Sequence, residues 1–145
     1  MTLDIPLLRS SFAIVVDREP ELTARFYERL FTDYPQSRPL FGRRSQRAQE
    51  EMLRDALIAV IDHLDDSQWL DGTLRALGRK HVDYGVTTPM YDWVGASLLA
   101  TLEVAAGEHW TATHAEQWAA AYGVVAGAMQ AGAAEVEAPD NARSA

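Results

Sequence analysis

The chain has 145 residues, of which 48% are hydrophobic and 23% are charged, a composition typical of one globular domain. Its formal net charge of -8 argues against nucleic-acid binding, because contacts to phosphates need a basic surface. The absence of cysteine excludes disulfides, iron–sulfur clusters and cysteine nucleophiles, and no apolar run reaches the roughly 18 residues of a membrane-spanning helix.

The first third of the chain predicts two amphipathic helices. Residues 3–16 carry regularly spaced apolar side chains. Pro20 then suits the first turn of a second helix, because its missing N–H costs nothing at that position. This second helix places Phe26 and Leu30 on one stripe, with Tyr27 beside them.

Prolines and a glycine break the chain before a long third helix. Pro35, Pro39 and Gly42 predict a short, irregular connection, and Ser45 is a suitable N-cap for a helix over 45–64. The predicted buried side of that helix comprises Met52, Leu53, Ala56, Leu57, Val60, Ile61 and Leu64.

Three further helices are predicted in the second half. One covers residues 67–82 and ends at a turn around Gly85. The next starts at Pro89 and is ended by Gly107. The last begins near Thr111 and runs to about residue 137.

No segment alternates with period two, so the sequence predicts an all-α fold. Helices of unequal length favour an irregular helical sandwich around a pocket over a regular bundle. We expect one domain over residues 1–137 and a disordered tail over 138–145, where Pro139 is followed by Asp140 and Asn141.

His81 is the candidate metal ligand. None of the four histidines has the spacing of a zinc or di-iron motif, but His81 continues the apolar stripe of Leu70, Leu74 and Leu77. It can be a core histidine bonded to a backbone carbonyl. Alternatively, an inward imidazole can hold haem iron from one side and leave the other side open to a gas.

Tyr27 is the candidate polar group on the opposite side. Its hydroxyl either reaches solvent at the edge of the core or donates to a bound ligand. Gln49 and Leu53 stand one turn apart on the third helix and would face the same way, although a single glutamine on a helix is more often exposed.

Several motifs together resemble the bacterial globins of the flavohaemoglobin and single-domain haemoglobin family. They are Lys80-His81 followed by Gly85-Val86, Tyr91 with Val94-Gly95 and Leu98-Leu99, Arg25-Phe26-Tyr27 with Leu30-Phe31, Arg38-Pro39-Leu40-Phe41, and Trp118 with Ala121-Tyr122-Gly123-Val124. The resemblance extends over residues 7–129 with the order of motifs preserved. It implies a globin fold, a three-on-three helical sandwich around a haem pocket, with haem b (iron protoporphyrin IX) as cofactor.

The resemblance also implies the roles of individual residues. His81 corresponds to the proximal iron ligand, Phe41 to the phenylalanine stacked on the porphyrin, Tyr91 to the tyrosine near the proximal histidine, Tyr27 to the distal tyrosine, and Gln49 with Leu53 to the distal pair, with Gln46 as a second candidate for the polar member. One departure is Ala133, which replaces a glutamate that bonds to the proximal side in flavohaemoglobins. The nearest carboxylate is Glu135.

The implied function is reversible oxygen binding, for storage, delivery or nitric oxide detoxification in the cytoplasm. Carbon monoxide and nitric oxide are further expected ligands. The chain ends where a flavohaemoglobin's reductase would begin, so nitric oxide dioxygenase activity would need an external reductase. A gas sensor or a haem-free interaction module is the alternative, and the sequence leaves monomer and homodimer open.

Overall fold

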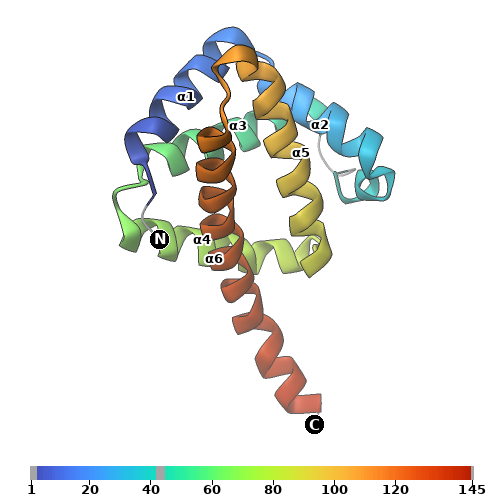
Figure 1. The fold of residues 1–145 in the computed structure, drawn as a ribbon. Coiled ribbons are helices and arrows are strands. Elements are labelled where there is room, and N and C mark those ends of the chain that lie inside the picture. Colours follow the sequence, from blue (N-terminus) through green and yellow to red (C-terminus); the bar gives the residue numbers. More distant parts are fainter. Residues whose placement is uncertain (1–2, 42–44, 145) are drawn as a thin grey trace.

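The computed structural model describes residues 3–41 and 45–144, with the backbone alone from residue 137 onward, and every regular element in it is helical (Figure 1). The elements are α1 (Ile5–Arg18), α2 (Leu22–Asp33), the 3-10 helix η1 (Pro35–Phe41), α3 (Gln46–Asp62), α4 (Ser67–Asp83), α5 (Thr88–Ala106), the 3-10 helix η2 (Gly107–His109) and α6 (Ala112–Ser144). The predicted all-α class is confirmed. None of these helices is both long enough and apolar enough to cross a bilayer, as far as the described residues go.

Short polar side chains start three of the helices. Asp4, Ser45 and Asp66 each accept the backbone N–H three residues later, at 3.1 Å in every case. Such caps satisfy one of the free N–H groups of a first turn. The prediction of Ser45 as N-cap is confirmed. Pro20 was expected inside the second helix, but it lies in the turn before it, because α2 begins at Leu22.

Two glycines make the sharp turns around α5. Gly85 has φ 84° and Gly107 has φ 55°, in the left-handed region that glycine enters without steric cost. Both stand where the sequence predicts a turn. The predicted break over residues 33–42 is the 3-10 helix η1 as far as Phe41, and Gly42 lies outside the described residues.

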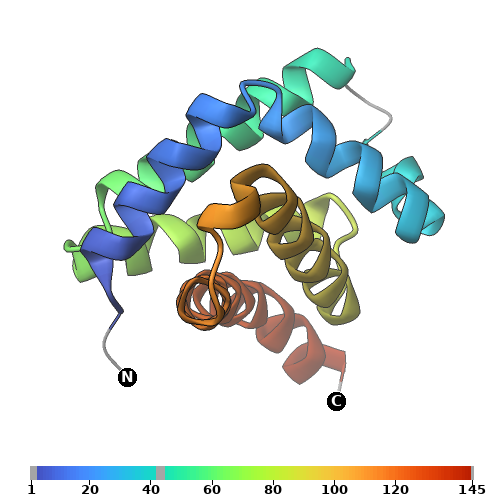
Figure 2. The ribbon, with the colours of Figure 1, turned by 45° about the horizontal axis from the view of Figure 1, so that its top comes forward.

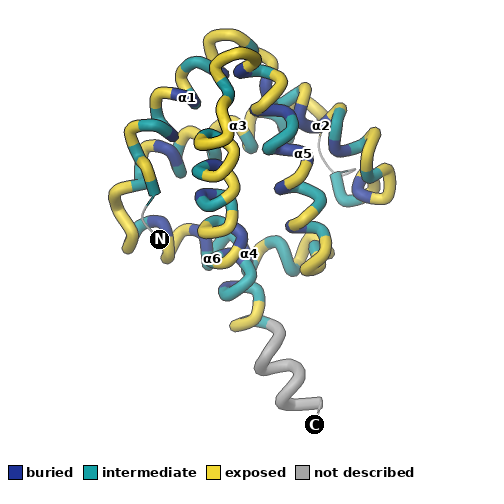
Figure 3. Tube along the Cα trace, in the orientation of Figure 1, coloured by how far each residue is buried: buried dark blue, intermediate teal, exposed yellow. Residues whose placement is uncertain are grey.

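The helices enclose two groups of buried side chains. The main core, built around Leu8, Leu30 and Leu102, joins α1, α2, the end of α3, α5 and the first turns of α6. In Figure 2, α1 and α2 lie along the upper edge of the molecule, with α5 and α6 below them. A smaller group, called the α4 core below, joins α4, α5 and α6. It consists of Leu70, Leu74, Tyr91, Ala126 and Met129. In Figure 3 the buried turns of each helix face inward.

Two details differ from the sequence-based expectations. Met52, assigned to the buried side of the third helix, is 46% exposed, whereas Ile61 near the end of the same helix is buried. The helix α6 is continuous through Ser144, past the residue where we expected the tail to begin. The boundary of the folded domain at residue 137 stays a prediction.

Candidate functional site

Tyr27 lies inside an aromatic group from α2 and η1. Its ring is 5.3 Å from that of Phe41, edge to face, and 5.7 Å from that of Phe31. Phe41 and Phe31 are themselves 5.6 Å apart. Edge-to-face and offset contacts of this kind stabilise aromatic pairs. The three rings therefore hold one another at the point where η1 returns to α2.

The hydroxyl of Tyr27 is buried and weakly bonded. Tyr27 is 5% exposed, and its hydroxyl oxygen lies 3.5 Å from the backbone carbonyl oxygen of Gln49, well beyond the roughly 2.7–2.8 Å of a good O–H···O bond. Burial, with a smaller contribution from Glu50, raises the pKa of Tyr27 to about 12. The phenol is thus protonated near neutral pH and able to donate to another acceptor.

The α3 residues predicted beside Tyr27 occupy different environments. Gln49 is half-buried and meets the tyrosine through its carbonyl, and Leu53, one turn later, packs against the main core. Gln46, the second candidate for the polar role, is exposed in the first turn of α3. The structure therefore brings Tyr27, Phe41, Gln49 and Leu53 into one neighbourhood and leaves Gln46 at its edge.

His81 is fixed by a hydrogen bond inside its own helix. Its Nδ1 lies 2.7 Å from the carbonyl oxygen of Leu77, and since a carbonyl can only accept, Nδ1 carries the proton. The other nitrogen, Nε2, has a free lone pair and no hydrogen-bond partner among the described residues. Burial lowers the pKa of His81, against the smaller opposing effect of the Leu77 carbonyl.

This bond agrees with either interpretation of His81. A structural core histidine needs an acceptor for its N–H, and a metal-binding histidine has its second nitrogen held in the same way by a neighbouring acceptor. The ring of Tyr84 lies 5.5 Å away, edge to face. A structural role needs only the bond from Nδ1, whereas a metal-binding role would also use the free Nε2.

The helices α3 and α4 follow each other in the chain but do not pack along each other. Few residue pairs bring their backbones together, whereas α4 makes close backbone contact with α6, which crosses it (Figure 1). Apolar side chains from the helices around α4 remain half-buried. They include Leu53, Leu57 and Val60 of α3, Leu77 of α4, Val86 before α5, and Trp93, Val94 and Leu99 of α5.

These features fit a flat, apolar group with a metal at its centre. Half-buried apolar side chains would gain burial against a porphyrin. The neutral imidazole of His81, with its free Nε2, could hold the metal of such a group, and the protonated phenol of Tyr27 lies on α2. The donor set of this chain is therefore compatible with haem.

The helices around His81 contain a second hydrogen bond that the sequence did not reveal. The Tyr122 hydroxyl of α6 donates to the backbone carbonyl of Tyr91 at 2.6 Å, and burial raises the pKa of Tyr122. Tyr91 belongs to the α4 core. A tyrosine at helical spacing from Trp118 was the available signal, but its partner on α5 depends on how the two helices cross.

The carboxylate nearest to Ala133 does not replace the missing glutamate. Glu135 binds Arg75 at 2.8 Å and Arg79 at 2.6 Å, both on α4. Ala133 itself is half-buried. Among the described residues, His81 is therefore held by the neutral carbonyl of Leu77 and by no carboxylate.

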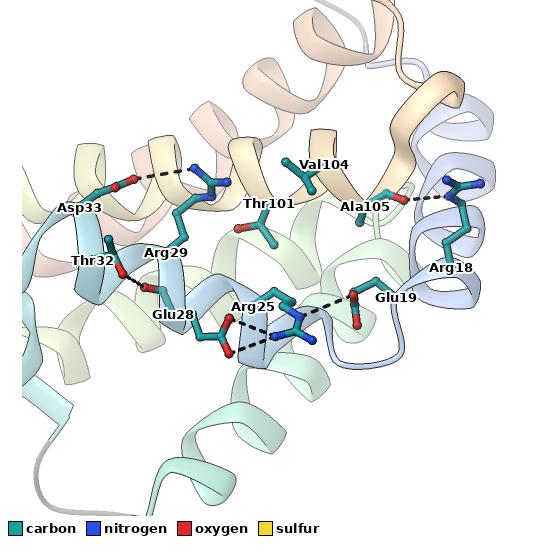
Figure 4. Close-up of a pocket in the computed structure, with 10 residues that line it drawn as sticks. All are labelled: Arg18, Glu19, Arg25, Glu28, Arg29, Thr32, Asp33, Thr101, Val104 and Ala105. Carbon is teal, nitrogen blue, oxygen red and sulfur yellow. Dashed lines mark hydrogen bonds and ion pairs between the residues drawn. The ribbon is translucent and has the colours of Figure 1, made fainter.

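A groove of about 760 Å³ lies elsewhere, between the end of α1, α2 and the end of α5 (Figure 4). Its lining residues are Arg18, Glu19, Arg25, Glu28, Arg29, Thr32, Asp33, Thr101, Val104 and Ala105. Arg25 is bound by two carboxylates, Glu28 at 3.1 Å and Glu19 at 3.7 Å. Arg29 pairs with Asp33, and Arg18 donates to the backbone carbonyl of Ala105. None of the predicted site residues lines this groove.

Comparison with known proteins identifies the family. Residues 24–129 match the Globin family model. The flavohemoprotein of Bordetella pertussis is 33% identical over 122 residues, which are 83% of this chain and 30% of the relative. The flavohemoprotein of Bacillus subtilis is 29% identical over 127 residues, 86% of this chain and 32% of the relative. The chain thus spans about a third of the length of these relatives.

Solved structures agree with this result. An engineered carbene transferase from Rhodothermus marinus, provisionally assigned as a nitric oxide dioxygenase, superimposes with a TM-score of 0.82 at 26% identity, covering 94% of this chain and 97% of the other. A bacterial globin from Campylobacter jejuni gives a TM-score of 0.78 at 23% identity, covering 92% and 96%, and supports the fold. The predicted globin fold is confirmed, and the chain belongs to the globin family.

Proposed function

We propose that this chain binds haem b through Nε2 of His81 and reversibly binds oxygen on the side of Tyr27. The observation that carries the proposal is the state of His81. Its Nδ1 is bonded to Leu77 at 2.7 Å, its Nε2 has no partner among the described residues, and α4 stands away from α3. A neutral imidazole beside half-buried apolar side chains is the kind of ligand that holds haem iron in globins.

When bound, haem would supply a ferrous iron at which a diatomic gas can bind. The chain would supply the rest. Phe41, held by Tyr27 and Phe31, would contact the porphyrin face, and Leu53 with its half-buried neighbours would exclude water. Leu77 would keep the imidazole in one tautomer by accepting its Nδ1 proton.

Tyr27 would act on the gas. Its hydroxyl is protonated and has one acceptor at the long distance of 3.5 Å, so it can donate to a ligand that gains negative charge. A hydrogen bond of this kind contributes about 1.5–3 kcal/mol. Gln49 is the second polar residue in reach of the same space, and it is preferred to the exposed Gln46.

An absorption spectrum tests the haem. The purified chain reconstituted with haemin is expected to show a Soret band whose position changes between the ferric, ferrous and carbon monoxide-bound forms. His81→Ala should abolish this spectrum. The matched control is His63→Ala, because Nδ1 of His63 also lies 2.7 Å from the carbonyl oxygen four residues earlier, while its ring is stacked on Trp69 at 3.6 Å.

A wild-type chain without a Soret band would contradict the proposal and favour a haem-free module. If wild type and His81→Ala had the same haem content and spectrum, haem binding would stand but the assignment of His81 as the iron ligand would be wrong. Loss of pigment in both histidine variants would show a general effect on folding.

The relatives favour a second candidate, nitric oxide dioxygenation with an external reductase. The provisional assignment of the Rhodothermus marinus structure as a nitric oxide dioxygenase points toward this chemistry. It would use the same residues, with electrons from a reductase. Consumption of nitric oxide by the oxygenated chain over many cycles, with a supplied reductase, would support it, and a single cycle per haem would not.

A further inference from the structure

The helix that carries His81 is attached to the rest of the molecule mainly through α6. Among the described elements, α6 is the one whose backbone approaches that of α4 closely. The contacts of α4 with α3 and α5 are made by a few side chains. The placement of His81 therefore depends on how α4 is set against α6. Figure 1 shows α6 crossing α4 at the lower edge of the molecule.

Two glycines allow this crossing to be close. A Cβ atom on Gly78 would overlap the backbone carbonyl of Met129, and a Cβ atom on Gly132 would overlap the backbone carbonyl of Arg75. Because the obstructing atoms are backbone, they cannot move aside as a flexible side chain can. The close contact thus depends on one glycine on each helix. Gly78 on α4 lies less than one turn before His81.

An ion-pair network covers the same crossing. The carboxylate of Glu135 bonds Nη1 of Arg75 at 2.8 Å and Nη1 of Arg79 at 2.6 Å, through one oxygen each. Asp71 holds Arg75 from behind at 2.9 Å. Both arginines belong to α4, so a single residue of α6 holds two successive turns of the helix that carries His81.

We propose that Glu135 is a positioning residue for His81: by binding Arg75 and Arg79 over the Gly78–Gly132 crossing, it sets the rotation and tilt of α4 and so the direction of Nε2. The inference rests on the proposed haem function. It assigns to Glu135 a geometric role, since the carboxylate is engaged by the two arginines and makes no contact with the imidazole among those described.

The first test compares Glu135→Gln with Glu51→Gln. Glu51 is a matched control because it also pairs with an arginine on the surface, Arg47 at 3.2 Å, but within α3. In the ferrous protein, Glu135→Gln should shift the iron–histidine stretching band in the resonance Raman spectrum. Release of haemin to an excess of scavenging apoprotein should become about two- to fivefold faster, the range expected of exposed ion pairs.

Salt gives an internal check on this comparison. High salt screens exposed charges, so the wild-type band and release rate should move toward those of Glu135→Gln, while the variant should change little. A residue that only stabilised the fold would lower the melting temperature without moving the iron–histidine band. Coincident bands and release rates for Glu135→Gln and Glu51→Gln would overturn the inference.

The second test uses the crossing itself. Gly78→Ala should move α4 away from α6 and shift the same band further than Glu135→Gln does. Gly72→Ala is the control on the same helix, because a Cβ atom there meets nothing within 4 Å. An unchanged band in Gly78→Ala would show that the crossing does not determine the direction of Nε2 of His81.

Hydrogen exchange separates this inference from the haem assignment. If the wild-type chain took up no haem, the proposed function would fail. Amide exchange across residues 67–83 of the haem-free chain would then test whether Glu135 and the glycine crossing hold α4 in place. Faster exchange in Glu135→Gln and Gly78→Ala than in their two controls supports it, and equal exchange overturns it.

Discussion

Tyr27 and His81, two polar residues of the candidate site, are held by different parts of the molecule. Tyr27 is part of the main core, where α2 packs on α5 and on the aromatic rings of η1. His81 lies on α4, which shares a smaller core and is attached to α6 by a glycine crossing and an ion-pair network. One side rests on apolar packing, the other on a close backbone contact and exposed charges.

This difference predicts unequal rigidity. Interior packing is dense and deforms little, so the direction of the Tyr27 hydroxyl should resist changes in salt and small substitutions on the surface. Exposed ion pairs are weaker and sensitive to salt, so α4 should be the side that moves. Regions with fewer buried contacts also open at lower free energy than the core.

The largest expected effect comes from removing buried leucines on the two sides. Leu30 in the main core is fully buried and Leu74 in the α4 core nearly so. Each change to alanine should cost about 2–5 kcal/mol of unfolding free energy. In native-state hydrogen exchange, Leu30→Ala should speed exchange throughout the chain, whereas Leu74→Ala should act first on residues 67–83. Identical exchange patterns would show that the two cores unfold as one.

Tyr27→Phe is expected to accelerate oxygen release about ten- to a hundredfold, because it removes a hydrogen bond worth about 1.5–3 kcal/mol. Stopped-flow displacement of oxygen measures the rate. The iron–histidine band should stay in place, since Tyr27 belongs to the other side. Equal release rates for wild type and variant would refute the distal role of Tyr27.

The smallest effect should appear in the pH dependence of the haem-free chain. Burial lowers the pKa of His81 in the folded state, below the roughly 6.5 of the unfolded state. Below that pH the unfolded chain therefore binds a proton before the folded chain does, and the unfolding free energy falls until the folded pKa is passed. Denaturant titrations at about pH 7.5 and 5 should show a smaller loss in His81→Gln than in wild type.

The opposite result would also be informative. If His81→Gln lost as much stability on acidification as wild type, His81 would titrate in the folded chain as it does when unfolded. The surroundings of His81 would then be open to water in the haem-free chain, and α4 would be loosely attached, which sharpens the contrast with the Tyr27 side.

Features decided within a few residues were predictable. Ser45 caps α3, and Gly85 and Gly107 turn the chain where expected, because a cap or a left-handed turn depends on a single side chain and its neighbours. The burial of Met52 was predicted wrongly because it does not depend on local sequence alone. Helical periodicity indicates an apolar stripe but not its width, and the packing of α3 leaves Met52 46% exposed.

Sequence by itself therefore determined the helices, most of their ends, the family and the set of residues around Tyr27, since these depend on local chemistry and on motifs preserved in order. Tertiary structure alone decided that α4 lies on α6 and apart from α3, that Gly78 and Gly132 meet backbone carbonyls, and that Glu135 binds two arginines of α4. Contacts between residues about 50–60 positions apart depend on helix crossing angles, and no local pattern encodes those.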